Sequence, residues 1–260
     1  MPPNAELNKQ QFNKQAETFA TWSLQRDVVV SEGTANFIGV TPTDTLLDVA
    51  CGSGSFVQYV SQRIASAIGI DIAERQIGIA IQKAAEMGIG NASFVCGSVE
   101  MLPFADNSFS VVSSKAAFHH FANTQTVFTE MYRCCKPGGL ICINDIITYD
   151  DDPEATRIID TMDSLIDISH YRRMSSAELS ELFSKMGMPV LRTKTIDFER
   201  SVIGYRQHAL QDQESIKQID ILLHDVVEHA RAPRYIYKKD EEIMFVNRGF
   251  LILGRKCNNQ

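Results

Sequence analysis

Two acidic residues and a glycine-rich turn are the residues of this sequence whose types and spacing are most typical of a ligand-binding site. Asp48 lies near the end of an apolar run that opens into the turn ACGSG at residues 50–54. Glycine lets the backbone bend sharply and lets a ligand approach to contact distance, which a Cβ would obstruct. A second apolar run ends at Asp71, whose carboxylate can accept hydrogen bonds from both hydroxyls of a ribose. This pattern predicts a cofactor that contains a nucleoside.

The same turn argues against two common phosphate sites. A dinucleotide fingerprint needs a third glycine three residues after Gly54, but Val57 stands there. A phosphate-binding loop would continue as Gly-Lys-Ser/Thr, and no such lysine follows. A nicotinamide-dependent oxidoreductase therefore remains only the less favoured alternative.

Four motifs in this order resemble the class I S-adenosylmethionine-dependent methyltransferases, in particular the branch similar to ubiquinone and menaquinone biosynthesis enzymes that acts on small molecules. They are LLDVACGSG (46–54), IGID (68–71), VCGSVEMLPFADNSFSVVSSKAAFHHF (95–121) and FTEMYRCCKPGGLICINDI (128–146). The resemblance covers roughly residues 40–150. It implies S-adenosylmethionine as cofactor and a small-molecule methyl acceptor as partner.

The resemblance also implies a cofactor site at the positions that match the family's motifs: Asp48, Ala50, Gly52, Gly54, Asp71, Ile72, Ser98, Val99 and Lys115. In the family, the acid matching Asp48 orients the glycine loop and the methionine amino group, and the acid matching Asp71 binds the ribose. Asp48 could instead only stabilise the turn, and Asp71 could instead cap the helix that begins near Ala73.

The adenine side of the implied site departs from the family pattern. Ile72 would pack on one face of the adenine. The family usually has an aspartate where Ser98 stands, so a hydroxyl would replace the carboxylate that accepts from the adenine amino group. We therefore expect recognition to depend more on the Val99 backbone. The backbone carbonyl of Lys115 would face the methionine portion, while its side chain could simply be solvated.

Two adjacent histidines are the candidate catalytic residues. A neutral imidazole at His119 or His120 could take a proton from the acceptor as the methyl group arrives. The alternative is a structural histidine bonded to the backbone. We favour His119 slightly, on expected exposure to the pocket. Asp145 and the segment His170 to Arg172 could line an acceptor pocket, although a structural role is favoured for them.

Composition narrows the classes of partner. The 260 residues carry a formal net charge of −7, which argues against a broad basic surface for nucleic acid. The six cysteines form no CxxC pair, so we expect structural thiols and no metal site. The polar N-terminal segment has no hydrophobic signal core, and no apolar run is long enough to span a bilayer, which predicts a cytoplasmic location. No feature assigns an oligomeric state.

Alternation of strands and helices predicts a Rossmann-like, doubly wound α/β fold in one domain, residues 1–260. The expected strands are 45–49, 66–70, 92–96, 109–114, 140–147, 189–199 and 243–253, with helices at 54–63, 74–87, 124–135 and 212–231 and others from Pro153 and Ser175. The resemblance implies that this seven-stranded sheet is mostly parallel with one antiparallel strand near the edge.

Two segments outside this alternation are expected to cover the site. The first is an N-terminal helical cap at about 8–40, in which Ser31 could start a second helix. The second is a lid-like insertion at about 149–173. The predicted function is methyl transfer to an oxygen, nitrogen or carbon nucleophile of a small, partly hydrophobic molecule. The alternative is a protein that binds S-adenosylmethionine or S-adenosylhomocysteine without transferase activity.

Overall fold

The computed structural model describes residues 3–207, 209 and 211–258. Its elements in chain order are α1 (Pro3–Lys14), α2 (Ala16–Ile38), β1 (Thr45–Val49), α3 (Ser55–Val60), β2 (Ser66–Asp71), α4 (Glu74–Glu86), β3 (Ala92–Cys96), β4 (Phe109–Lys115), a short 3-10 helix η1 (Phe118–His120), α5 (Thr124–Cys134), β5 (Cys135–Ile146), α6 (Pro153–Ile166), α7 (Ser176–Lys185), β6 (Val190–Ser201), α8 (Val202–Arg206), α9 (Gln213–Glu228), β7 (Ile236–Lys239) and β8 (Glu242–Arg255).

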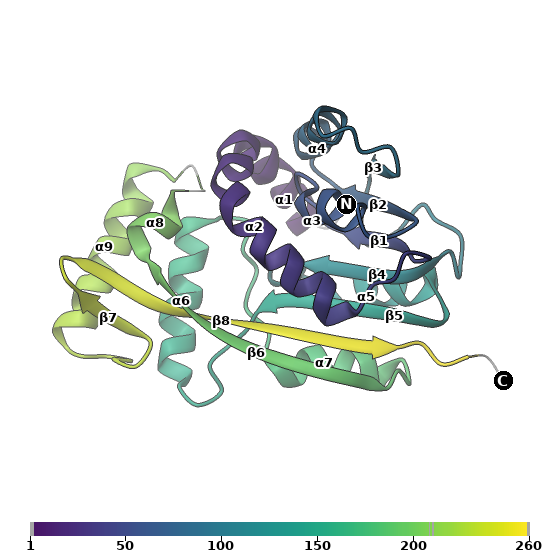
Figure 1. Ribbon diagram of the computed structural model, residues 1–260. Coiled ribbons are helices and arrows are strands. Elements are labelled where there is room, and N and C mark those ends of the chain that lie inside the picture. The colour runs from purple at the N-terminus through teal and green to yellow at the C-terminus, as the bar shows by residue number, and fades with distance from the viewer. Residues whose placement is uncertain (1–2, 208, 210, 259–260) are drawn as a thin grey trace.

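A single sheet of order β3-β2-β1-β4-β5-β8-β6 runs through the molecule, with β7 paired to β8 (Figure 1). Strands β1 to β5 are parallel, and β8 is antiparallel to β5, β6 and β7. The predicted mostly parallel sheet with one antiparallel strand near the edge is therefore confirmed. The strand order reverses between β1 and β4, where open α/β sheets bind their ligands.

The described residues form eight strands, one more than the seven predicted. The additional strand is β7, a four-residue segment that pairs with the start of β8. It was missed because Lys238 to Glu242 reads as a solvated turn. Only Asp240 and Glu241 turn, and Asp240 adopts a left-handed φ of 53° there.

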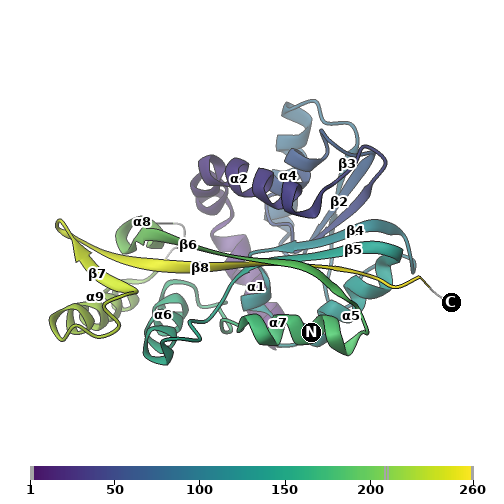
Figure 2. The same cartoon turned by 60° about the horizontal axis from the view of Figure 1, so that its bottom comes forward.

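Side chains alternate between the two faces of the sheet, as the period of a strand requires. Leu46 and Val111 belong to a core with α2 and α3, whereas Leu47 and Val112 belong to a core with α5 and α7. Figure 2 shows α2 and α4 on one side of the sheet and α5 and α7 on the other. Both faces are therefore covered, and ligands must enter at the strand ends.

The N-terminal segment forms two helices, but their boundary differs from the prediction. Helix α2 continues through Ser31, which is buried inside the helix and caps nothing. No proline interrupts residues 16–38, so the helix continues until Gly39, whose φ of 76° gives it a left-handed cap.

A second hydrophobic core lies beyond the end of the main sheet. It joins α6 to α8, α9, β7 and the start of β8, with Ile158, Leu223 and Phe245 among its buried residues. These elements gather at one end of the molecule in Figure 1. Strands β6 and β8 form a long ribbon that connects this second core to the main sheet. The segment predicted as a lid is thus part of a larger packed unit.

Candidate functional site

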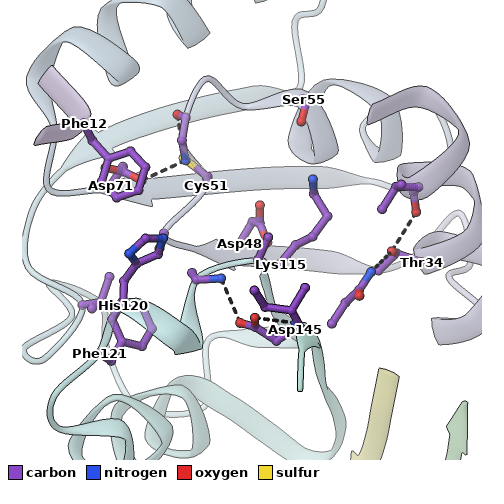
Figure 3. A pocket seen from close by; sticks show the side chains of 18 of the residues that line it. Phe12, Thr34, Asp48, Cys51, Ser55, Asp71, Lys115, His120, Phe121 and Asp145 are labelled. Carbon is purple, nitrogen blue, oxygen red and sulfur yellow. Dashed lines mark hydrogen bonds between the residues drawn. The ribbon is translucent and has the colours of Figure 1, made fainter. Parts of the chain in front are cut away.

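A cavity of about 590 Å³ lies at the carboxyl ends of β1, β2, β4 and β5 and continues over β8 and β6 (Figure 3). Of the predicted site residues, nine line it: Asp48, Ala50, Gly52, Asp71, Ile72, Ser98, Val99, Lys115 and His120. Gly54 and His119 do not. The volume falls in the range typical of small-molecule and cofactor sites.

The two glycines of the first turn have different structural roles. Gly52 has a φ of 54°, and a Cβ built on it would meet no protein atom within 4 Å. Because Gly52 lines the cavity, that open space is available to a ligand. A Cβ on Gly54 would lie 2.5 Å from Cε1 of Phe94 and 2.9 Å from Cβ of Ala80. The absence of a side chain at Gly54 is therefore required by packing of α3 and α4 on the sheet, which differs from the ligand approach expected from the sequence.

Asp71 joins the second strand end to the glycine turn. Its Oδ2 accepts a hydrogen bond of 2.8 Å from the Gly52 amide, and its Oδ1 accepts one of 2.9 Å from the Ala73 amide. A carboxylate has about four lone-pair sites, so each oxygen can still accept a ligand hydroxyl. Burial raises the pKa of Asp71, and the backbone hydrogen bonds partly offset that rise.

Asp48 is a buried acid with a perturbed pKa. Burial raises the pKa of Asp48 to about 7, against the lowering effects of the Ser113 hydrogen bond and the Lys115 charge. Ser113 Oγ donates to Asp48 Oδ1 over 2.8 Å. Figure 3 shows Asp48 and Lys115 close together in the cavity. A cationic ligand group beside Asp48 would favour its ionised form.

The residues expected to contact adenine follow the ends of β2 and β3. Ile72 and Val99 line the cavity and present apolar surface to it. Ser98 lines it as well, and its Oγ accepts a hydrogen bond of 3.3 Å from the Glu100 amide. The Ser98 proton is therefore left to donate to a ligand, and a second lone pair can accept from one. Ala50 completes this wall and holds a left-handed φ of 59°.

The side chains of His119 and His120 lie in different environments. His119 Nδ1 bonds Asp145 Oδ1, and Asp145 Oδ2 accepts from the amides of Ala117 and Phe118. Burial lowers the pKa of His119, but the Asp145 charge and hydrogen bond outweigh burial and raise it overall. His119 is thus part of a buried ion pair that fixes the turn after β4, and it is His120 that lines the cavity.

His120 is held as a neutral imidazole. Its Nδ1 lies 3.1 Å from the Ser169 carbonyl oxygen, which can only accept, so Nδ1 carries the proton and Nε2 keeps a lone pair. Burial and the neighbouring His119 lower the pKa of His120 to about 3. A group with this pKa is a weak base at neutral pH but a competent hydrogen-bond acceptor.

Helix α1 closes one wall of the cavity. The Nδ2 atoms of Asn4 and Asn8 both donate to the His120 carbonyl oxygen, and the Phe12 ring meets the His120 ring edge to face at 5.0 Å. Asn8 is 8% exposed and lines the cavity, and its Oδ1 has no hydrogen-bond partner among the described residues. A buried acceptor of this kind calls for a donor from a ligand or water.

The far wall of the cavity comes from strands that the sequence did not connect with the site. Lys194, Ile196, Phe198 and Arg200 of β6 line it together with Gly249 and Leu251 of β8. No motif marks these positions; only alternation along β6 could have indicated one shared face.

The segment His170 to Arg172, for which the sequence favoured a structural role over contact with an acceptor, makes structural contacts. His170 Nε2 bonds Asp160, and Arg172 pairs with Glu178 over 2.7 Å. Tyr171 is half exposed and, like His170 and Arg172, does not line the cavity. Asp145 does line it. Within the described ranges, no cluster of three or more His, Cys, Asp or Glu side chains is arranged to hold a metal ion.

Comparison with known proteins agrees with the fold. Residues 47–143 match the family model of the methyltransferase domain. Residues 47–143 thus carry a methyltransferase domain, and the named relatives and the shared fold agree with an S-adenosylmethionine-dependent methyltransferase.

The relatives span part of the chain. An uncharacterized methyltransferase, YcgJ of Bacillus subtilis, is 28% identical over 63% of this chain and 71% of its own length. A demethylmenaquinone methyltransferase of Oceanobacillus iheyensis is 32% identical over 46% of this chain and 52% of its own. The matched region thus spans only about half of the latter enzyme.

Solved structures share the fold. The crystal structure of YcgJ superposes with a TM-score of 0.77 at 23% identity and covers 90% of this chain and 100% of its own. The [4+2]-cyclase SpnF superposes with a TM-score of 0.64 at 17% identity, covering 89% of this chain and 82% of its own. The same fold therefore also serves another reaction.

Proposed function

We propose that this protein transfers the methyl group of S-adenosylmethionine to an oxygen, nitrogen or carbon nucleophile of a small, partly hydrophobic molecule. The observation that carries the proposal is one cavity that joins the ends of the first two strands, at Gly52 and Asp71, to a wall on β6 and β8 that carries both apolar and basic side chains. Gly52 leaves its backbone accessible to a ligand, and the Asp71 carboxylate has two oxygens that can accept hydrogen bonds. Both features suit an adenosyl group. The continuous apolar extension suits an acceptor.

S-adenosylmethionine, when bound, supplies an activated sulfonium methyl. The acceptor's electron pair would form the new bond to carbon, the pair of the broken C–S bond would stay on sulfur, and the proton lost by the acceptor would pass to bulk water. The protein's contribution is alignment and exclusion of water. His120 has too low a pKa to store that proton, so we assign it the role of orienting the acceptor through its Nε2 lone pair.

Calorimetry with S-adenosylhomocysteine and with NAD tests the cofactor assignment. We expect binding of S-adenosylhomocysteine and none of NAD, and binding of NAD alone would refute the proposal. Turnover is then tested with isotopically labelled methyl donor against quinol precursors, phenols and small amines. A labelled product supports the transferase, whereas tight cofactor binding without any product favours the alternative.

That alternative is a cofactor-binding protein without transferase activity. It is supported by Ser98, which stands where the family usually has an aspartate, and by the use of this fold in a [4+2]-cyclase. Fold-level similarity alone does not decide the reaction.

The pKa of Asp48 makes cofactor affinity dependent on pH. If the ionised carboxylate holds the α-ammonium group of the ligand, S-adenosylhomocysteine should bind about tenfold more tightly at pH 8 than at pH 6, because a group with a pKa near 7 ionises over this range. We expect the Asp48→Asn variant to bind weakly and without this pH dependence, as measured by calorimetry at each pH.

A stability measurement separates a lost ligand contact from a damaged fold. The folded pKa of Asp48 lies above the unfolded value of 3.8, so the carboxyl destabilises the folded state progressively as pH rises from about 4 to 7. Asp48→Asn should therefore melt at or above the wild-type temperature at pH 8. A lower melting temperature together with weak binding would point to misfolding and contradict the assignment.

We further propose that α1 and α2 act as a cap over the cofactor, within a single methyltransferase domain, and that α6 begins an insertion that supports the acceptor side. The contacts of Asn4 and Asn8 with His120 support the first assignment. The six free thiols favour a reducing compartment such as the cytoplasm. In the part of the chain that is described, no helix has the length and apolar character to cross a bilayer.

A further inference from the structure

One row of residues crosses the sheet from the cofactor end of the cavity to its far wall. Lys115 of β4 is in register with Asn144 of β5, Asn144 with Leu251 of β8, and Leu251 with Lys194 of β6. All four residues line the cavity. Neighbouring strands lie about 4.8 Å apart, so Lys194 stands roughly 14 Å from Lys115. The cavity is therefore long enough to hold an acceptor beside the cofactor.

Apart from Asn144, the floor between the two lysines is apolar. Leu251 lies in the row itself, and Ile146, Gly249 and Ile196 form the row two residues further along the strands. Val29 and Val30 of α2 also line the cavity and are 71% and 37% exposed, so they face it without being covered by protein. An apolar ligand body would remove this surface from water.

Charge is distributed unevenly along the cavity. Asp48, Asp71 and Glu100 line the cofactor end, whereas the β6 wall carries Lys194 and Arg200. Arg200 stacks on the rings of Phe198 and Tyr205, with its Cζ 4.7 and 5.1 Å from their centroids. Lys194 is exposed and forms no ion pair with any described residue. In a chain of net charge −7, this end is locally basic.

From this arrangement we infer the class of acceptor: a molecule with an apolar body and an anionic group such as a carboxylate, whose charged end is held by Lys194. This inference rests on the proposed function, since it places the acceptor beside a bound cofactor. The apolar body lies along Leu251 and Ile196, and the nucleophile points back towards Lys115 and His120. A neutral acceptor of the same shape would leave Lys194 without a partner.

Calorimetry on the full chain saturated with S-adenosylhomocysteine tests the inference with dodecanoate and its neutral counterpart dodecanamide as probes. We expect dodecanoate to bind about fivefold more tightly, the size of effect that one partly exposed ion pair provides. Lys194→Met should reduce that preference to near one. The matched control is Lys185→Met, which removes an exposed lysine paired with Glu181 on α7 and should keep the preference.

Three outcomes would overturn the inference alone: equal binding of both probes to the wild type, binding of neither probe, or an undiminished preference in Lys194→Met. In each of them S-adenosylhomocysteine still binds, so the proposed function stands. Failure of S-adenosylhomocysteine itself to bind would instead refute the proposed function, and the inference with it.

Discussion

Replacing Asp71 with alanine is expected to weaken S-adenosylhomocysteine binding by at least tenfold in calorimetry. A hydrogen bond to a charged acceptor contributes about 1.5–3 kcal/mol, and about 1.4 kcal/mol corresponds to a factor of ten. Asp71 lines the cavity and keeps free lone pairs beside its bonds to Gly52 and Ala73. Two ribose hydroxyls would use those lone pairs.

The same substitution removes two hydrogen bonds to backbone amides, so the ligand must be varied as well as the protein. The 3′-deoxyribose analogue of S-adenosylhomocysteine lacks one of the hydroxyls. Wild-type protein should prefer the parent compound, and Asp71→Ala should show almost no preference. Glu86→Ala, on the exposed surface of α4, serves as the matched acidic control. An intact preference in Asp71→Ala would show that the ribose lies elsewhere.

The pair Gly52→Ala and Gly54→Ala should separate ligand contact from folding. In Gly52→Ala the new methyl meets no protein atom, and the left-handed backbone costs about 1–2 kcal/mol. We expect a modest fall in melting temperature and a loss of S-adenosylhomocysteine affinity of more than tenfold, because the methyl occupies space that the ligand needs. Differential scanning calorimetry and titration calorimetry measure the two effects.

In Gly54→Ala we expect the loss of stability to be the larger effect and the loss of ligand affinity the smaller one. The new Cβ would collide with Phe94 and Ala80, and overpacking costs about 1–3 kcal/mol in addition to the backbone term. The melting temperature should fall more than in Gly52→Ala. Adding Phe94→Leu to Gly54→Ala should restore part of the loss by making room. If both alanine variants behaved alike in stability and in binding, the division of roles between the two glycines would be wrong.

The first half of the fold and the cofactor end of the cavity were predictable from sequence because they depend on local signals. Asp48 lies next to the end of one short apolar strand and Asp71 at the end of another, and parallel strands bring such ends to one edge. The turn at Gly52 can be predicted from the residue type alone. These signals act within a few residues of each other and need no knowledge of distant contacts.

The acceptor wall could not be predicted in this way. Lys194 reaches the cavity only because β8 inserts between β5 and β6, a pairing between segments far apart in the chain. Which of the two histidines faces the cavity likewise depends on a residue far away in the chain. The side chain of His119 is hydrogen-bonded to Asp145, and His120 is the histidine that lines the cavity. The expectation that His119 rather than His120 faces the pocket was therefore wrong.

The β6–β8 ribbon has one end in each hydrophobic core, and the acceptor floor lies on the stretch between them. A small tilt of the outer unit formed by α6, α8, α9 and β7 would shift Ile196 and Gly249, while the glycine turn after β1, three strands from β8, would stay in place. Changes in that outer unit would thus reshape the proposed acceptor side of the cavity and leave the glycine turn as it is.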